Sequence, residues 1–229
     1  MLEIFTSTYP IFLKAVVLTL QLTITSLALA CVIGLIFAFF RISNSKILNG
    51  IAQVYIAIIR GTPLIVQIMI LYFGITSIIV LSPFWAGTIA LAIHGGAYIT
   101  EIFRGAIQSV DRGQLEAARS LGMSYPLAMR RIVLPQAFRL SIPPLGNQFI
   151  IGLKDSSLVA YIGGTSELWG SALSEAAANY QQLETYMIVG FYYLVLVLLF
   201  TYLVHLLEKR MARKNKVNVQ NNQQKEVSM

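Results

Sequence analysis

The sequence predicts an all-α integral membrane protein with about five transmembrane helices, and three observations support this. Hydrophobic residues make up 56% of the 229 residues and charged residues only 12%, about half the charged share of soluble domains. Several apolar runs are long enough to cross the hydrocarbon core, which takes about 20 residues of helix. Most Lys and Arg residues fall in three blocks between these runs, the pattern expected when positive residues stay on the cytoplasmic side.

The predicted spans follow one another along the chain, and the first covers residues 18–40. The second apolar stretch, residues 47–80, is too long for one straight crossing and is interrupted at Pro63. Either one helix is kinked there, or residues 47–59 form an interfacial segment and Thr62 caps a new helix with Pro63 in its first turn. The remaining spans are predicted at residues 84–107, from about residue 135, and at residues 186–207.

The distribution of charge predicts which side each end of the chain occupies. No Lys or Arg precedes Lys14, and none occurs from Asp155 to Glu208. Basic residues instead gather between residues 104 and 139 and between residues 209 and 216. The positive-inside rule therefore predicts an N-terminus outside and a C-terminus in the cytoplasm, and an odd number of crossings requires the same arrangement.

The net charge of +7 does not indicate a nucleic-acid partner. Nucleic-acid binders cluster Lys and Arg on a soluble face, often with exposed aromatics, whereas the basic blocks here follow the membrane topology. Residues 1–214 are expected to form one transmembrane domain with a cytoplasmic loop at residues 108–135. Residues 215–229 are polar, and we expect them to form a disordered cytoplasmic tail.

Cysteine and histidine, which often act as nucleophiles, bases or metal ligands, are rare in this sequence. Cys31 is the only cysteine, and the two histidines, His94 and His205, lie far apart in the sequence. We therefore expect no catalytic residue and no metal site. No Gly-rich loop ending in Gly-Lys-Ser or Gly-Lys-Thr is present, so ATP is expected to act in another subunit, and no cofactor is expected in this chain.

Three features of the apolar segments have structural interpretations. His94 is expected to be a packed or hydrogen-bonded residue, because a lone histidine without a second ligand is more often structural than functional. Gly95 and Gly96 are expected to mark close helix contacts, since small residues let backbones approach in lipid. Arg60, near the cytoplasmic boundary, is expected to anchor the chain there rather than to bind substrate.

The segment before the fourth span predicts two short helices with a turn between them. Asp111 is expected to cap the first helix, and Glu116 is placed to pair with Arg112 or Arg119 at helical spacing. Gly122 is placed to end that helix in a left-handed conformation, which other residues adopt only at a cost. A compact helical hairpin is therefore expected to project into the cytoplasm.

The fixed positions of this segment form a pattern. Glu116, Ala117 and Ala118 are followed by Gly122 and then by Ile132, Leu134 and Pro135. This pattern resembles the EAA loop of bacterial ABC importer permeases. In that family the loop forms the coupling helix that docks in a groove of the ATPase subunit, so the resemblance implies that these seven residues couple this chain to an ATPase.

Further matches extend the resemblance over most of residues 10–210. Residues 60–67, 97–105, 112–114 and 153–158 resemble signatures of permeases for polar amino acids. Asp111 departs from the pattern, because the family usually has proline there; this alters a helix start and leaves the coupling role intact. The resemblance implies the type I ABC importer permease fold in a bacterial inner (cytoplasmic) membrane.

The same resemblance implies a function and a set of partners. The chain would be the pore-forming subunit of an importer for a polar amino acid such as arginine, glutamine or cystine. Its implied partners are two ATPase subunits that hold ATP and Mg, a second permease subunit that is either identical or different, an extracytoplasmic amino-acid-binding protein, and membrane lipid.

Ionisable side chains within spans are costly and often functional, so polar residues there are candidates for substrate binding. A carboxylate of Glu101 or Asp155 facing an internal cavity could hold the ammonium group of a zwitterionic substrate. The alternative is that Glu101 only pairs with Arg104 and that Asp155 only neutralises Lys154. The candidates are Glu101, Asn147, Gln148, Asp155, Ser156 and Ser157.

An ion-coupled secondary transporter of small solutes is the alternative function. Such a protein would also have intramembrane carboxylates and broken helices, but it would usually show internal repeats. The sequence shows none, and a secondary transporter would work without an ATPase.

Overall fold

A computed structural model describes the backbone of residues 2–164 and 166–227 and the side chains of residues 3–164 and 166–211. Within these ranges the chain is helical with no strand, which confirms the predicted all-α class. The predicted disorder of residues 215–229 stays a prediction, although the described backbone continues as helix to Val227. The helices are α1 (Leu2–Ile42), α2 (Lys46–Gly61), α3 (Leu64–Met69), η1 (Ile70–Gly74), α4 (Pro83–Gln108), α5 (Arg112–Ser120), α6 (Tyr125–Ala128), η2 (Met129–Val133), α7 (Leu134–Asp155), η3 (Ser156–Ile162), α8 (Leu168–Asn179) and α9 (Gln182–Val227).

The predicted spans correspond to helices of this set. In the described residues, α1 and α9 are each long and apolar enough to cross a membrane, and the α2–α3 pair adds a third candidate if its two arms form one span. The bounds of α4 and α7 agree with the third and fourth predicted spans. The count of five crossings, and the orientation, stay predictions.

Helix α1 begins much earlier than the predicted residue 18. It starts at Leu2 and continues through Pro10. Ile4 and Phe12, which precede the predicted span, are buried in a cluster with Leu168 and Val189 of the following helices. Tertiary packing therefore extends the helix, although a proline in the interior costs one backbone hydrogen bond.

The helix is broken after α2, and the following segment, α3 with η1, is bent by 105° from α2. Of the two alternatives from sequence, the structure is closer to the one with two separate helices, but the predicted cap of the second helix by Thr62 is wrong. Thr62 ends α2 and its hydroxyl donates to the carbonyl of Ile58 at 2.9 Å, whereas Pro63 precedes α3 and provides no side-chain cap. The guanidinium of Arg60 lies 4.9 Å from the centre of the Tyr98 ring, so this residue attaches the end of α2 to α4.

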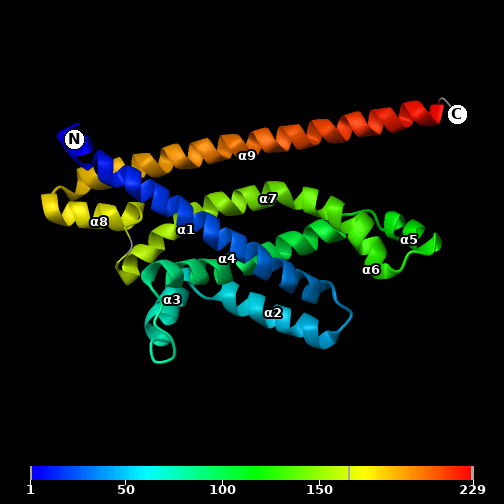
Figure 1. The fold of residues 1–229 in the computed structure, drawn as a ribbon, viewed down its shortest axis with the longest axis horizontal. Coiled ribbons are helices and arrows are strands. Elements are labelled where there is room, and N and C mark those ends of the chain that lie inside the picture. The colour runs from blue at the N-terminus through cyan, green and yellow to red at the C-terminus, as the bar shows by residue number, and fades with distance from the viewer. Residues whose placement is uncertain (1, 165, 228–229) are drawn as a thin grey trace.

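The centre of the fold is the packing of α1 against α4. Ala30 and Ala38 of α1 form a buried cluster with Ile99 and Phe103 of α4. A Cβ added to Gly34 would lie 2.6 Å from Cγ2 of Ile99, so only glycine permits this approach of the two helices. Figure 1 shows α1 crossing α4 in the middle of the molecule, with α7 and α9 on one side and α2 and α3 on the other.

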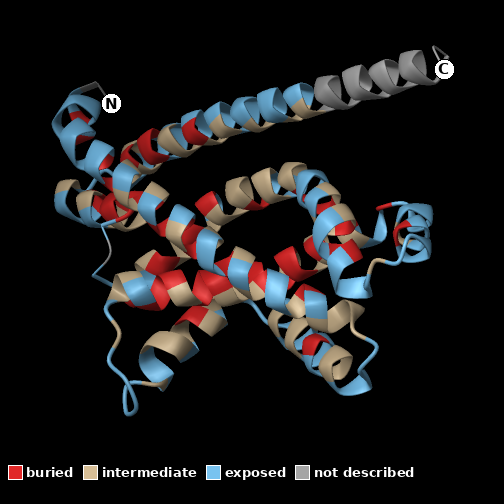
Figure 2. Ribbon diagram, turned by 45° about the vertical axis from the view of Figure 1, so that its right-hand side comes forward, coloured by how far each residue is buried: buried red, intermediate tan, exposed pale blue. Residues whose placement is uncertain are grey.

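The two ends of the molecule differ. In Figure 1 the N-terminus and α8 lie at one end, while α5 and α6 project at the other. Figure 2 shows burial concentrated where the central helices meet, and much of the surface of α9 is exposed. The exposed side chains there include Phe191, Leu194, Leu198 and Leu199, the apolar surface expected of a helix long enough to span a membrane.

Candidate functional site

A small cavity lies between α1, α4 and α7, near the middle of α4. Its volume is about 20 Å³, room for about one water molecule. The wall is mixed, because aliphatic and aromatic residues such as Leu27, Leu91 and Phe149 alternate with polar ones. The polar lining residues are Thr23, Ser26, His94, Gln148 and Asp155.

Two of the predicted substrate residues, Gln148 and Asp155, come together in this cavity. They lie two turns apart on α7, so their side chains share one face. In the described part of the chain neither side chain has a hydrogen bond or an ion pair within 4 Å. No ion pair within 4 Å joins Asp155 to the exposed Lys154, although the positive charge of Lys154 still acts on this carboxylate, as the alternative from sequence expected.

Three other candidates lie outside the lining of the cavity. Asn147 is exposed, because it is one residue from Gln148 and consecutive residues on a helix point in different directions. Ser156 and Ser157 donate their hydroxyl protons to carbonyls of the preceding turn, Leu153 at 2.8 Å and Lys154 at 2.7 Å. The two serines thus stabilise the end of α7.

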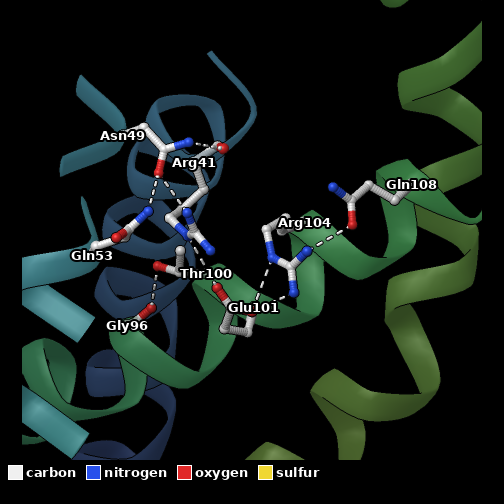
Figure 3. A network of polar contacts seen from close by, with 8 residues as sticks. All are labelled: Arg41, Asn49, Gln53, Gly96, Thr100, Glu101, Arg104 and Gln108. Atoms are coloured by element: carbon white, nitrogen blue, oxygen red, sulfur yellow. Dashed lines mark hydrogen bonds and ion pairs between the residues drawn. The ribbon is translucent and has the colours of Figure 1, made fainter. Parts of the chain in front are cut away.

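Glu101 also lies apart from the cavity, in a network of polar residues at the junction of α1, α2 and α4 (Figure 3). Its carboxylate accepts from Arg104 at 2.6 Å and lies 3.5 Å from Nε of Arg41. Arg41 in turn contacts Asn49 of α2. The pairing with Arg104 that the sequence offered as the alternative is therefore present, and Arg41 is a second partner that helical spacing did not indicate.

Sequence reasoning missed the contribution of α1 to the cavity. Thr23 and Ser26 are almost fully buried, and each donates to a carbonyl of its own helix, Thr19 at 2.8 Å and Thr23 at 3.1 Å. Their oxygens keep lone pairs with which to accept a hydrogen bond. Hydroxyl residues at helical spacing within an apolar span could have indicated this polar face.

His94 is hydrogen-bonded, as the sequence predicted, and it also lines the cavity, which the sequence did not predict. Its Nδ1 lies 3.1 Å from Oε1 of Gln67 on α3. The neighbouring Gly96 does mark a close helix contact, because a Cβ there would lie 2.8 Å from Cγ2 of Ile33. This confirms the interpretation of the glycine pair.

The predicted coupling segment forms the expected helical hairpin. The carboxylate of Asp111 accepts from the backbone N–H of Gly113 at 2.8 Å and so caps α5. Gly122 has a φ of +84°, which confirms the left-handed end of this helix. The expected pairing of Glu116 with Arg112 or Arg119 is not formed in the described residues, so the charge of Glu116 faces solvent.

The seven predicted coupling residues differ in exposure. Glu116, Ala117, Gly122 and Pro135 are exposed, Ile132 and Leu134 are half-buried, and Ala118 is buried. Large apolar side chains are also exposed on this hairpin: Leu121 is 84% exposed and Tyr125 is 49% exposed. Below them Val110, Met129 and Val133 form a buried cluster that attaches the hairpin to α4 and α7. The hairpin thus projects with apolar side chains at its tip, and the buried cluster at its base holds it on α4 and α7.

Comparison with known proteins gives a consistent result. The family described as "Binding-protein-dependent transport system inner membrane component" matches residues 30–213. The chain is 38% identical over 205 residues to the glutamine transport system permease protein GlnP of Escherichia coli (strain K12), covering 88% of this chain and 93% of that protein. It is 35% identical over 204 residues to the arginine transport system permease protein ArtQ of Bacillus subtilis (strain 168), with the same two coverages. It is 38% identical over 209 residues to the L-cystine transport system permease protein TcyB of the same organism, covering 90% and 89%.

Two solved structures are similar in fold. One is described as an amino acid ABC transporter with histidines; it has a TM-score of 0.83 and 40% identity, and the match covers 90% of this chain and 96% of that one. The other is an inward-facing MetNI methionine ABC transporter, with a TM-score of 0.78 and 18% identity over 90% of this chain and 98% of that one. At that identity the second match supports the fold alone.

Proposed function

Because the chain belongs to the family of binding-protein-dependent transport system inner membrane components, we propose that it is the pore-forming subunit of an ATP-driven importer of a polar amino acid. The named relatives carry out glutamine, arginine and cystine transport. These substrates share an α-ammonium and an α-carboxylate group. The proposal therefore specifies the class of substrate and leaves the individual amino acid to experiment.

The observation that carries the proposal is the carboxylate of Asp155. It lines a cavity between three helices, next to Gln148, and in the described residues it forms no ion pair. A carboxylate without a partner in a low-dielectric site is costly, and an ammonium group of a substrate would offset that cost. Asp155 is thus suited to hold the ammonium, with Gln148 as a donor or an acceptor for the remaining polar groups.

The size of the cavity bears on how such a site would work. A volume of about 20 Å³ is several times smaller than an amino acid, so α7 must move away from the α1–α4 pair to admit a substrate. In an alternating-access cycle, rigid helices would open this space to each side in turn. The close contact of Gly34 with Ile99 makes the α1–α4 pair the rigid part of this arrangement.

The energy would come from outside this chain. The α5–α6 hairpin projects from the helices (Figure 1), and its exposed Leu121 and Tyr125 suit burial against another protein. We propose that it docks on an ATPase subunit that holds ATP and Mg. The assembly would have two ATPase subunits, two permease subunits and an extracytoplasmic binding protein, in a bacterial cytoplasmic membrane with the hairpin in the cytoplasm.

The test is transport by the complex reconstituted in proteoliposomes with its ATPase and binding protein. We expect Asp155→Asn and Gln148→Ala to weaken substrate-stimulated ATP hydrolysis and uptake, with a loss of about tenfold or more for Asp155→Asn, because a hydrogen bond to a charged group contributes about 1.5–3 kcal/mol. Asn147→Ala is the matched control, since Asn147 adjoins Gln148 but lies outside the cavity lining.

Two results would contradict the proposal. Wild-type kinetics in the Asp155→Asn complex would show that the cavity is not the substrate site. Uptake by this chain without any ATPase subunit, driven by an ion gradient, would favour the secondary transporter.

A further inference from the structure

The side-chain amide of Gln67 has a fixed orientation. Its Nε2 donates to the carbonyl of Ile59 at 2.8 Å, to the carbonyl of Thr62 at 3.1 Å and to the hydroxyl of Thr62 at 2.8 Å. Backbone carbonyls only accept hydrogen bonds, so the nitrogen of this amide must face the end of α2. The oxygen of the amide therefore faces the other way, toward α4.

This orientation determines the protonation of His94. Oε1 of Gln67 lies 3.1 Å from Nδ1 of His94. An amide oxygen can only accept, so the hydrogen bond requires a proton on Nδ1. A neutral imidazole carries one N–H, and which nitrogen bears it is determined by the hydrogen bond that the ring makes. Nε2 is therefore left as an acceptor.

His94 is also one of the residues that line the cavity between α1, α4 and α7. Gln67, by contrast, is not among the residues that line it. Nδ1 makes the one hydrogen bond of this ring in the described part of the chain, so Nε2 has no protein partner there. One nitrogen of this cavity-lining residue is thus held by Gln67 of α3, and the other has no partner in the described part of the chain.

We propose that Gln67 holds His94 as the Nδ1–H tautomer and that His94 Nε2 accepts a hydrogen bond from the substrate, so that the cavity selects amino acids whose side chains carry N–H donors. This inference rests on the proposed function of the chain. Nε2 of His94 and the carboxylate of Asp155 then give the cavity two acceptors. Side chains with an amide or a guanidinium group suit such a site, whereas a side-chain carboxylate would meet like-charged or lone-pair groups.

In this arrangement His94 is a residue that determines specificity, and Gln67 is a positioning residue that acts through it. The same Gln67 amide holds the end of α2, so the break between α2 and α3 and the tautomer of His94 depend on one side chain. A substrate that displaces the His94 ring would therefore also disturb the hydrogen bonds of Gln67 to the end of α2.

The tautomer can be measured without transport. The chain has two histidines, so the ¹⁵N spectrum of ¹⁵N-histidine-labelled permease, assembled with unlabelled ATPase in lipid, contains two imidazoles. His205→Asn removes one of them and assigns the other. At a pH above about 6.5, where a histidine is ordinarily neutral, we expect a protonated Nδ1 and an unprotonated Nε2 at His94. The opposite pattern would overturn the proposal, whatever the transport activity.

The role of Gln67 is tested in the same spectrum. Gln67→Leu removes the acceptor at nearly the same side-chain size, and the His94 signals should move toward the Nε2–H form that an imidazole without this contact favours. Gln67→Glu, when its carboxyl group is protonated, can donate its O–H to the carbonyls at the end of α2 and accept from Nδ1 with its other oxygen, so it should keep the wild-type pattern. Unchanged tautomer signals in Gln67→Leu would show that Gln67 does not position the ring.

Specificity is tested by equilibrium binding of labelled arginine, glutamine and glutamate to the purified permease–ATPase assembly, with the binding protein omitted. His94→Asn keeps an amide N–H near the position of Nδ1, so the contact with Gln67 survives, but it removes Nε2. Of arginine and glutamine, we take the one that wild type binds. The ratio of its affinity to that for glutamate should fall by about tenfold in His94→Asn. His205→Asn, on the exposed part of α9, should keep the wild-type ratio.

The outcomes separate the two proposals. An unchanged ratio in His94→Asn would overturn the role of His94 in specificity while leaving the importer function in place. If wild type bound none of the three amino acids, the proposed substrate class would fail, and the ¹⁵N spectrum would still decide the His94–Gln67 arrangement.

Discussion

Arg41, in the last turn of α1, lies 3.5 Å from Glu101 of α4, and the same carboxylate accepts from Arg104 at 2.6 Å. One acidic side chain thus pairs with two guanidinium groups and joins two helices that are far apart in the sequence. Its contacts are already made within the protein, whereas Asp155 has no such partner in the described residues. This difference separates a structural carboxylate from a candidate binding residue.

We predict that Glu101→Gln destabilises the assembly and leaves substrate affinity unchanged. The three side chains are between 21% and 29% exposed, so the network is partly shielded, and the loss should be about 1–2 kcal/mol. Thermal unfolding in detergent measures it. Glu208→Gln is the control, since its contact with His205 is more exposed and should contribute little. A stable Glu101→Gln assembly that no longer binds substrate would instead restore Glu101 as a substrate residue.

We predict that Gly122→Ala weakens the association with the ATPase subunit. Gly122 has a φ of +84°, a conformation that costs other residues about 1–2 kcal/mol. A Cβ would meet no atom within 4 Å at Gly122 or at Gly105 of α4, so Gly105→Ala controls for the added methyl group itself. Co-purification of the ATPase with the permease should fall by about tenfold for Gly122→Ala. Equal recovery with the two variants would contradict a docking role for this turn.

We predict that Gly34→Ala disrupts the packing of α1 on α4. The new Cβ would lie 2.6 Å from Cγ2 of Ile99 and 3.1 Å from its backbone carbonyl carbon, so relief requires the helices to separate. Such overpacking typically costs about 1–3 kcal/mol, which a lower melting temperature would report. Gly50→Ala, where nothing lies within 4 Å, should be neutral or stabilising because alanine favours helix. A Gly34→Ala melting temperature equal to that of wild type would show that this contact is easily relaxed.

We predict that the carboxyl group of Glu167 makes the stability of the protein depend on pH. It precedes α8, outside the membrane-spanning helices, and its side chain is fully buried. The carboxylate accepts from the N–H groups of Gly170 at 2.6 Å and Trp169 at 2.8 Å, and from the hydroxyl of Tyr193 at 3.1 Å. Burial raises the pKa of Glu167 to about 7, although these hydrogen bonds oppose the shift.

The direction in which stability changes with pH follows from the raised pKa of Glu167. Between the ordinary value of about 4.5 and about 7, the folded state binds the Glu167 proton more tightly than the unfolded state does. The stability due to this group is therefore fully present below about pH 4.5 and is lost as the pH rises toward 7. The melting temperature of wild type should fall between about pH 5 and 8 by more than that of Glu167→Gln. Parallel profiles for the two proteins would mean that Glu167 does not titrate in this range.

Much of the fold and of the coupling segment could be predicted from the sequence. The positions of α4 and α7, the cap at Asp111 and the left-handed Gly122 follow from apolar run lengths and from local backbone chemistry, which short stretches of sequence encode. The same local rules failed at Thr62. It was expected to begin α3, but its hydroxyl donates to the carbonyl of Ile58 and so ends α2. Local propensity allows both arrangements, and the way α2 and α3 pack on α4 selects one.

The sequence alone determined that this is a helical membrane chain with a basic hairpin of the kind predicted to lie in the cytoplasm. Composition, spacing and blocks of charge can all be read from the chain in one dimension. Only the tertiary structure decided which polar side chains meet. Asn147 and Gln148 are neighbours in sequence, yet only Gln148 reaches the cavity; Glu101 and Asp155 are both carboxylates in apolar helices, yet only Glu101 is paired with arginines. The physical reason is that the rotation of each helix about its axis, and the partner helix it packs against, are fixed by long-range contacts that spacing along the chain does not specify.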